Sequence, residues 1–273
     1  MTFSIDPGEL VGSTLEWTTG EIRIHGPDQL PAVLYLPGLH GDWTLLHRFR
    51  ECLSGRARLV EVIYPRWFTG TLSEQAATLR AALLKRGVDQ VWILAESFGS
   101  QLAWALLDPN YPEPRFRVNG LILAGGFVRH PWVGGVKLTE GVCRRIPMRL
   151  ARGILAMMRP LIQWRLGFSR GGYQASRQFI ARRTEEDRCA AVHRLNLIAS
   201  TDLRPIAAAT TVSVWYLTGF FDWVVPWPPV LSWLRRHCPG WRGYRILVAC
   251  DHAVLVTQPQ ASAKTVLDWI KPP

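Results

Sequence analysis

The stretch from residue 91 to residue 107 constrains the fold more than any other part of this sequence. It begins with an apolar run, continues through Ser97, and ends in a segment whose apolar residues fall at helical spacing. This pattern predicts a buried strand, a sharp turn that carries Ser97, and a helix. Such a turn strains the serine backbone and needs small neighbours, because larger side chains would collide with the strand or the helix. Ala95, Gly99 and Ser100 meet that need.

Strands and helices alternate along most of the chain. Continuous apolar runs indicate strands buried on both faces, and their alternation with helices is typical of an α/β fold with a mostly parallel sheet and helices on both faces. The first two strands are expected to pair antiparallel across a short turn. Predicted strands are residues 13–18, 21–25, 32–36, 59–64, 91–94, 120–124, 212–217 and 244–249, and further predicted helices are residues 72–86, 228–238 and 258–270.

The alternation stops between residues 127 and 204. This segment contains several helical stretches and no predicted strand, and it carries fifteen Lys or Arg against five Asp or Glu. Because strands and helices alternate again after it, we expect a helical insertion in one sheet domain. The predicted organisation is a core made of residues 1–126 and 205–273, with an insertion at 127–204.

Composition excludes several classes of protein. With 48% hydrophobic and 19% charged residues, the chain can form a compact core and is not a disordered protein. Its five cysteines include no C-x-x-C pair, so we expect a reducing compartment and no metal site. The first twelve residues resemble no signal peptide, and no apolar run reaches the roughly 18 residues of a membrane span. We therefore expect a cytoplasmic protein, and no helix-turn-helix or zinc spacing indicates nucleic-acid binding.

Ser97 has two interpretations, an ordinary helix N-cap or a nucleophile. A nucleophilic serine needs a histidine to accept its proton and a carboxylate to orient that histidine. His252 and Asp222 both lie just beyond predicted strands, where strand ends would bring them near Ser97. Asp251 is the alternative carboxylate, but adjacent side chains in extended backbone point in opposite directions. The simpler interpretation of His252 and Asp222 is a loop histidine and a turn aspartate.

These motifs together resemble the α/β-hydrolase superfamily. The elbow resembles its G-x-S-x-G motif with Ala95 in the first glycine position, and the acid loop from Gly219 to Pro226 resembles the family's glycine, aspartate and Val-Pro pattern. Ser97, Asp222 and His252 also follow the family's order. The resemblance covers residues 31–128 and 211–273 and implies a serine esterase or lipase-like enzyme with a helical cap at 127–204.

The resemblance also implies an oxyanion hole made of two backbone amides. The first is that of Phe98, directly after Ser97. The second is that of Leu39, because Pro37-Gly38-Leu39 resembles the family's His-Gly-x turn, with Pro37 in place of the histidine. His40 and Gly41 are alternatives if the loop is shifted.

The predicted function is hydrolysis of carboxylic esters through an acyl-enzyme, with a small-molecule acyl ester as substrate and no cofactor. The same residues would serve a thioesterase, an amidase, a C-C bond hydrolase or an acyltransferase. A binding protein that kept the fold without catalysis is the rival of a different class. We place four residues in the substrate pocket: His40, Met157, Leu161 and Trp223.

The basic insertion leaves three interpretations open. Within residues 144–168, arginines and apolar residues are expected on different faces of a helix. The apolar face would cover the active site as a lid, or lie on an anionic membrane that attracts the arginines. The third interpretation is a solvated basic face on an ordinary cap. The arginines are Arg145, Arg149, Arg152 and Arg159, and the apolar residues are Ile146, Leu150, Ile154, Met157 and Leu161.

Overall fold

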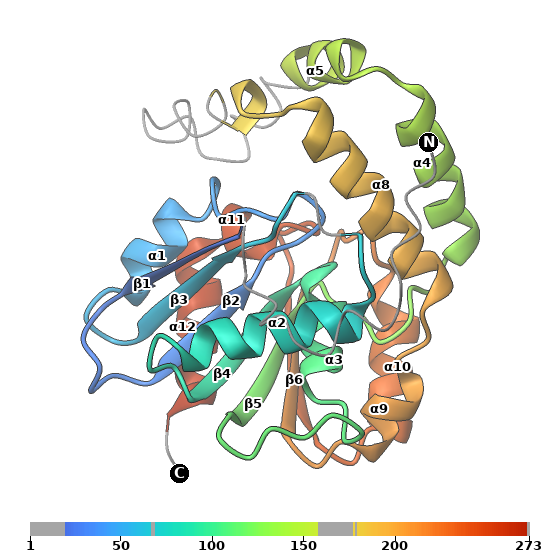
Figure 1. Ribbon diagram of the computed structural model, residues 1–273. Coiled ribbons are helices and arrows are strands. Elements are labelled where there is room, and N and C mark those ends of the chain that lie inside the picture. The colour runs from blue at the N-terminus through green and yellow to red at the C-terminus, as the bar shows by residue number, and fades with distance from the viewer. Residues whose placement is uncertain (1–19, 67–68, 158–176, 178, 272–273) are drawn as a thin grey trace, which may run out of the picture.

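The computed structural model describes residues 20–66, 69–157, 177 and 179–271 (Figure 1). In these ranges the strands form a seven-stranded sheet with the order β1-β3-β2-β4-β5-β6-β7. Within this sheet β1 pairs antiparallel with β3, and all other neighbours are parallel. The predicted α/β class with a mostly parallel sheet is therefore confirmed. The strands are β1 (Glu21–His25), β2 (Ala32–Leu36), β3 (Arg58–Ile63), β4 (Gln90–Glu96), β5 (Arg117–Ala124), β6 (Ser213–Gly219) and β7 (Trp241–Leu247).

Helices cover both faces of the sheet and bury two separate apolar clusters. One face packs against α2 (Leu72–Leu84), α3 (Gly99–Leu106), α9 (Arg204–Ala209) and α10 (Trp227–His237). The other face packs against α1 (His47–Leu53), α11 (Val254–Thr257) and α12 (Pro259–Ile270). The central strands contribute side chains to both clusters, which explains why their sequences are continuously apolar.

Three further helices lie between β5 and β6: α4 (Val133–Arg145), α5 (Met148–Met157) and α8 (Glu185–Ser200). Helix α4 packs against α8, and α5 lies at the far end of this group from α9 and α10 (Figure 1). Helix α8 begins with a capping box in which Thr184 and Asp187 satisfy each other's backbone amides. No helix in the described ranges is both long and apolar enough to cross a membrane.

Some predicted elements differ from those observed. The last strand was placed at 244–249, but it runs from Trp241 to Leu247, because pairing with β6 begins at Val214 and Trp241. The predicted hairpin partner of Glu21–His25 lies outside the described residues, so that pairing stays a prediction, and within the described ranges β1 pairs with β3. Helix α1 was not predicted. It has seven residues, too few for a clear helical period.

The predicted helical face across residues 144–168 is wrong as a continuous feature. Helix α4 ends at Arg145, and Ile146 has an extended ψ of 120° before α5 begins at Met148. Pro147 explains the break, because a proline disfavours the helical conformation of the residue before it. Arg159 and Leu161 lie outside the described residues.

Candidate active site

The turn between β4 and α3 carries Ser97 in a strained conformation. Ser97 has a φ of 49° and is the one residue other than glycine with positive φ in the described part of the chain. A Cβ atom on Gly99 would lie 2.2 Å from the carbonyl oxygen of Leu36, so this position accepts only glycine without a backbone shift. The small residue expected after the serine is thus required by the close approach of α3 to β2.

Ser100 ties this turn to the end of the neighbouring strand. Its hydroxyl donates to the carbonyl oxygen of Ser97 at 2.6 Å and accepts from the amide of Phe127 at 3.0 Å. The amide of Ser97 in turn donates to the carbonyl oxygen of Ala124 at 3.0 Å. The backbone amide of Ser97 is therefore bonded directly to the end of β5, and its carbonyl is linked through Ser100 to Phe127, just after that strand.

Asp222 and His252 form a buried hydrogen-bonded pair. The Oδ2 atom of Asp222 accepts from Nδ1 of His252 at 2.8 Å, and the aspartate is only 4% exposed. Its Oδ1 atom accepts from the amides of Val224 and Val225 at 3.1 and 2.8 Å. Both carboxylate oxygens are therefore engaged, and the side chain is fixed in the orientation that holds the histidine ring.

Hydrogen bonds join the loops that carry these two residues. The amides of Phe220 and Phe221 donate to the carbonyl oxygens of Leu247 and Cys250, both at 2.9 Å. A Cβ atom on Gly219 would lie 2.2 Å from the carbonyl oxygen of Asp251. Glycine at the end of β6 therefore allows the two loops to approach closely.

The alternative partner of His252 can now be compared with Asp222. Asp251 uses its Oδ1 atom to accept from the amide of Ala253 at 3.0 Å, which caps its own turn. The carboxylate that accepts the hydrogen bond of His252 is that of Asp222.

His252 lies next to the end of β5, to which Ser97 is also bonded. A Cβ atom on Gly125 would be 3.0 Å from Nδ1 of His252, so the ring rests on the glycine backbone. Within the described residues no hydrogen bond joins the hydroxyl of Ser97 to His252, and such contacts often tighten only when substrate binds. Ser97 and His252 thus both contact the carboxyl end of β5, although neither residue belongs to that strand.

The environment of His252 favours its charged form. Burial lowers the pKa of His252, but the hydrogen bond and charge of Asp222 and the charge of Glu96 outweigh burial. The pKa is therefore raised above its ordinary value of 6.5. A histidine of raised basicity is suited to accept a proton.

The loop after β2 approaches the serine from the other side. A Cβ atom on Gly38 would lie 3.4 Å from Cβ of Ser97. The amide of Gly41 donates to the carbonyl oxygen of Gly38 at 3.0 Å, so the loop is a closed turn. Among the described residues, no backbone acceptor takes the amide of Leu39 or that of Phe98.

Two residues near the site were missed in the sequence. Tyr35 is buried on β2 and its hydroxyl donates to the carboxylate of Glu96, directly before Ser97. Burial raises the pKa of Glu96, and the Tyr35 hydrogen bond and the charge of His252 partly offset that rise. The position of Glu96 inside the elbow motif was a usable signal. Tyr35 has no such signal, because the continuous apolar run around it indicates only a buried strand.

The four predicted pocket residues are not gathered in one cavity by the described structure. His40 packs edge to face against Phe179, with ring centroids 4.8 Å apart. Met157 and Trp223 are 82% and 83% exposed. Leu161 lies outside the described residues, so the substrate pocket stays a prediction. No cluster of three His, Cys, Asp or Glu able to hold a metal occurs within the described ranges.

No protein-family model matches the sequence, and no curated protein matches it. Solved structures do resemble the fold. An α/β-hydrolase enzyme from a deep-sea metagenome library has a TM-score of 0.73 at 14% identity, covering 93% of this chain and 94% of that chain. An enol-lactonase from Burkholderia xenovorans has a TM-score of 0.72 at 17% identity, covering 92% and 96%. An esterase from Thermogutta terrifontis has a TM-score of 0.71 at 20% identity, covering 92% of each chain. The sheet order, the strained serine turn and these superpositions together show that this chain has the α/β-hydrolase fold.

Proposed function

We propose that this protein is a serine hydrolase that cleaves carboxylic esters through an acyl-enzyme. One observation carries the proposal. A serine with a φ of 49° lies on a strand-to-helix turn that is bonded to the end of β5, and the same strand end packs against a histidine that is hydrogen-bonded at 2.8 Å to a buried carboxylate. Strain of this kind persists only where the surrounding structure enforces it, and it concentrates at functional sites.

In the proposed mechanism the Oγ atom of Ser97 attacks the acyl carbon while Nε2 of His252 takes its proton. Asp222 holds the histidine in the tautomer that leaves Nε2 free to accept, and stabilises the imidazolium that forms. The former carbonyl oxygen becomes an oxyanion, which the amides of Phe98 and Leu39 would bind. His252 then protonates the leaving alcohol, and a water activated by the same histidine releases the acid.

Ester substrates are favoured over the other acyl donors by the similar structures, which include an esterase and an enol-lactonase. The fold and the triad do not distinguish an ester from a thioester or an amide, since the mechanism is common to all three.

A fluorophosphonate probe tests the proposed nucleophile, because it reacts only with an activated serine. We expect one label per chain on wild-type protein and none on Ser97→Ala. Ser54→Ala is the control for general serine reactivity, because Ser54 is exposed after α1 and should leave the labelling unchanged. Folded wild-type protein that takes no label would overturn the proposal.

A substrate panel tests the acyl donor. Short and long p-nitrophenyl esters would be compared with acyl-CoA thioesters and anilides at equal enzyme concentration. We expect turnover of at least one ester class, lost in Ser97→Ala. Turnover of thioesters alone would reassign the enzyme as a thioesterase on the same residues.

We further propose that residues 127–204 form a cap that governs access to this site. The segment lies between β5 and β6, and Arg194 in α8 contacts the carbonyl oxygen of Leu39 at 2.7 Å. His193 in the same helix contacts the carbonyl oxygen of Gly70 at 3.1 Å. The inserted helices therefore touch loops at the carboxyl end of the sheet, where substrates of this kind of fold bind.

A further inference from the structure

Helix α8 inserts a charged side chain behind the proposed oxyanion loop. Arg194 is only 5% exposed, and its Nη1 atom donates to the carbonyl oxygen of Leu39 at 2.7 Å. A Cβ atom on Gly41 would lie 2.6 Å from the same nitrogen. The guanidinium carbon is 5.2 Å from the ring centroid of Tyr64 and 6.0 Å from that of Phe98. Arg194 therefore fills the space between the loop and the residue after Ser97.

Arg183 is also buried, but in the described part of the chain it has a carboxylate partner and Arg194 has none. Arg183 is 4% exposed and forms an ion pair with Asp42. Within the described residues, Arg194 forms no ion pair, and Leu39 is its one hydrogen-bond acceptor. Burial lowers the pKa of Arg194 to about 10, so the side chain stays charged at neutral pH. A buried unpaired charge is costly, and a packing role alone would be served better by an apolar residue.

The rest of the loop is held by other groups. The hydroxyl of Tyr64 donates to the carbonyl oxygen of Pro37 at 2.9 Å. The backbone amide of Tyr64 donates to the carbonyl oxygen of Gly41 at 3.0 Å. These contacts fix the two ends of the turn. The carbonyl of Leu39, in the middle, is held by Arg194. Its orientation therefore depends on helix α8.

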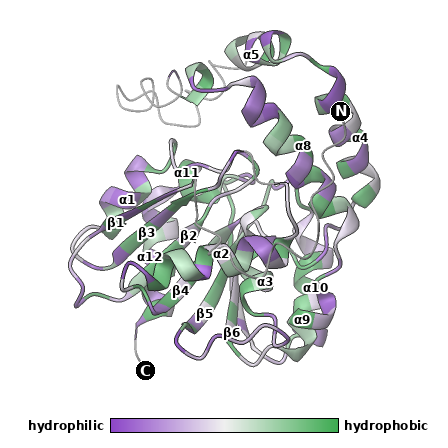
Figure 2. Ribbon diagram, in the orientation of Figure 1, coloured by the Kyte–Doolittle hydropathy of each residue, from purple (hydrophilic) through white to green (hydrophobic). Residues whose placement is uncertain are grey.

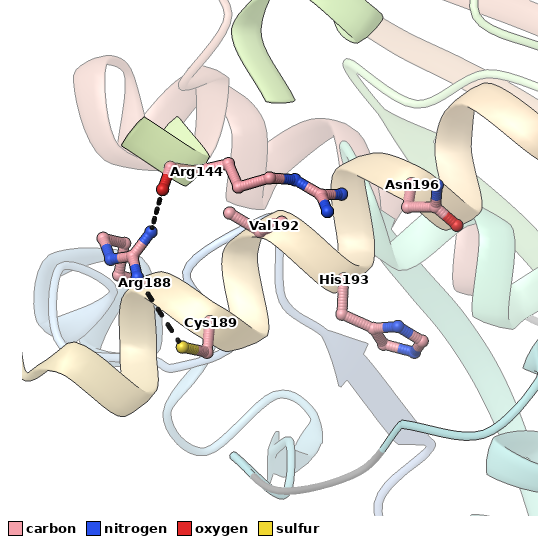
Figure 3. A pocket seen from close by; sticks show the side chains of 6 residues that line it. All are labelled: Arg144, Arg188, Cys189, Val192, His193 and Asn196. Atoms are coloured by element: carbon pink, nitrogen blue, oxygen red, sulfur yellow. Dashed lines mark hydrogen bonds between the residues drawn. The ribbon is translucent and has the colours of Figure 1, made fainter. Parts of the chain in front are cut away.

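Helix α8 is itself fixed at several points. Arg188 donates to the carbonyl oxygens of Cys143 and Arg144 at 2.8 and 3.0 Å, and Figure 3 shows it reaching the main-chain oxygen of Arg144. The hollow in that view is lined by residues of α4 and α8 and contains none of the proposed catalytic residues. Arg66 pairs with Asp187 at 3.0 Å on the core side. Arg194 thus projects from a helix anchored to both the inserted helices and the core.

We propose that Arg194 is a positioning residue, which holds the Leu39 carbonyl and thereby sets the orientation of the loop that binds the oxyanion. This inference rests on the proposed function. It makes the oxyanion site depend on α8, so that displacement of this helix would weaken transition-state binding without removing a catalytic group. The positive charge behind the loop also favours the negative charge that develops on the substrate oxygen.

The test compares Arg194→Met and Arg194→Lys with wild type, and uses Arg144→Met as the control for loss of an exposed cap arginine. Active sites are titrated with a fluorophosphonate, so kcat refers only to correctly folded enzyme. For Arg194→Met we expect kcat to fall by about tenfold to a hundredfold, less than the loss of a whole oxyanion donor. KM should stay within about threefold, because the interaction acts in the transition state. The pH midpoint of activity should not move, because His252 is untouched.

Arg194→Lys keeps the charge but loses the planar guanidinium, so we expect a kcat between those of wild type and Arg194→Met. If Arg194→Met does not fold, the test rests on Arg194→Lys. A wild-type kcat in that variant would overturn the proposal that Arg194 positions the loop. Wild-type kcat per titrated site in both variants would overturn it as well. So would a raised KM confined to substrates with a negative charge, which would make Arg194 a substrate-binding group. Wild-type protein that neither takes the label nor turns over any ester would instead contradict the proposed function.

Discussion

Three hydrogen bonds fix the carboxylate of Asp222 in its buried position. It accepts two backbone amides and the histidine ring while only 4% exposed. Asp222→Asn keeps the shape and the backbone contacts of one oxygen, but it mis-sets the tautomer of His252. We expect kcat to fall by about 10⁴-fold with little loss of stability. Ester turnover and thermal unfolding of the purified variant measure the two effects.

Asp251→Asn is the matched control for this prediction, because it changes the same functional group one residue before His252. Its Oδ1 atom caps a turn through Ala253, so we expect a small change in turnover. A larger loss in Asp251→Asn than in Asp222→Asn would identify Asp251 as the orienting acid.

The raised pKa of His252 sets the acid limb of the activity profile. A protonated His252 cannot accept the serine proton, so kcat/KM should fall as the pH drops through its pKa. Because that pKa is raised above 6.5, the midpoint should lie above pH 6.5. Glu96→Gln removes a negative charge that raises the pKa of His252, so the midpoint should move to lower pH.

Glu51→Gln is the control for the pH experiment, since Glu51 is exposed on α1. Its profile should superpose on that of wild type. An unshifted midpoint in folded Glu96→Gln would show that the charge of Glu96 does not reach the histidine.

At the scale of single elements, two glycines in helices should respond in opposite ways to alanine. Gly99→Ala places a Cβ atom 2.2 Å from a backbone oxygen at the start of α3, and such overpacking typically costs about 1 to 3 kcal/mol or more. Gly153→Ala in α5 meets nothing within 4 Å. It should stabilise that helix by about 0.5 to 1 kcal/mol. Urea unfolding would measure the first effect, and hydrogen exchange at α5 the second.

Helix α5 presents an apolar stripe that the described structure leaves uncovered. Leu150, Ile154 and Met157 are all exposed. Figure 2 shows hydrophobic and hydrophilic residues side by side on this helix. If α5 is part of a lid, Met157→Ala should change KM and acyl chain-length preference while phosphonate labelling of Ser97 persists. Leu138→Ala, an exposed apolar residue of α4, is the control.

If α5 is part of a lid, at least one substitution in its apolar stripe should change the acyl chain-length preference. An unchanged chain-length profile in both Met157→Ala and Leu150→Ala would exclude a role of the α5 stripe in substrate choice. The proposed chemistry at Ser97 would be unaffected by that result.

The whole molecule is strongly asymmetric in charge. The formal net charge is +11, and the fifteen basic and five acidic residues of 127–204 account for +10 of it. We propose that the apolar stripe of α5 binds anionic membranes together with the arginines of α5 and Arg145 at the end of α4. Replacing Arg145, Arg149 and Arg152 with Gln should weaken binding to phosphatidylserine vesicles by roughly 3 kcal/mol at low ionic strength, about 1 kcal/mol for each charge.

Added salt should weaken the wild-type binding too, because exposed charges are screened within about 10 Å at 0.1 M. The matched control replaces three exposed arginines outside the inserted segment and should retain the binding. They are Arg56, Arg86 and Arg117. Wild-type protein that stays unbound to anionic vesicles at low salt would eliminate the membrane proposal and leave the lid as a separate question.

The sequence by itself determined the alternation of the parallel strands with most of their helices, the serine turn and the glycine that follows it. These features depend on neighbours along the chain: an apolar run predicts a buried strand, and a residue two positions from the serine must be small. It also predicted that Asp222 and His252 follow strand ends. Parallel strands bring their carboxyl ends to one edge, so residues far apart in sequence could be expected close together.

Only the tertiary structure decided which partners those residues meet. The hydrogen bond from His252 to Asp222 depends on the close approach of two loops at Gly219, and that from Tyr35 to Glu96 on the pairing of β2 with β4. The contact of Arg194 with Leu39 joins residues 155 positions apart. No local periodicity encodes a contact at that distance, because it depends on where an inserted helix packs. The sequence pattern marked Arg194 as one basic residue among fifteen, and only its burial together with its contact to Leu39 distinguishes it.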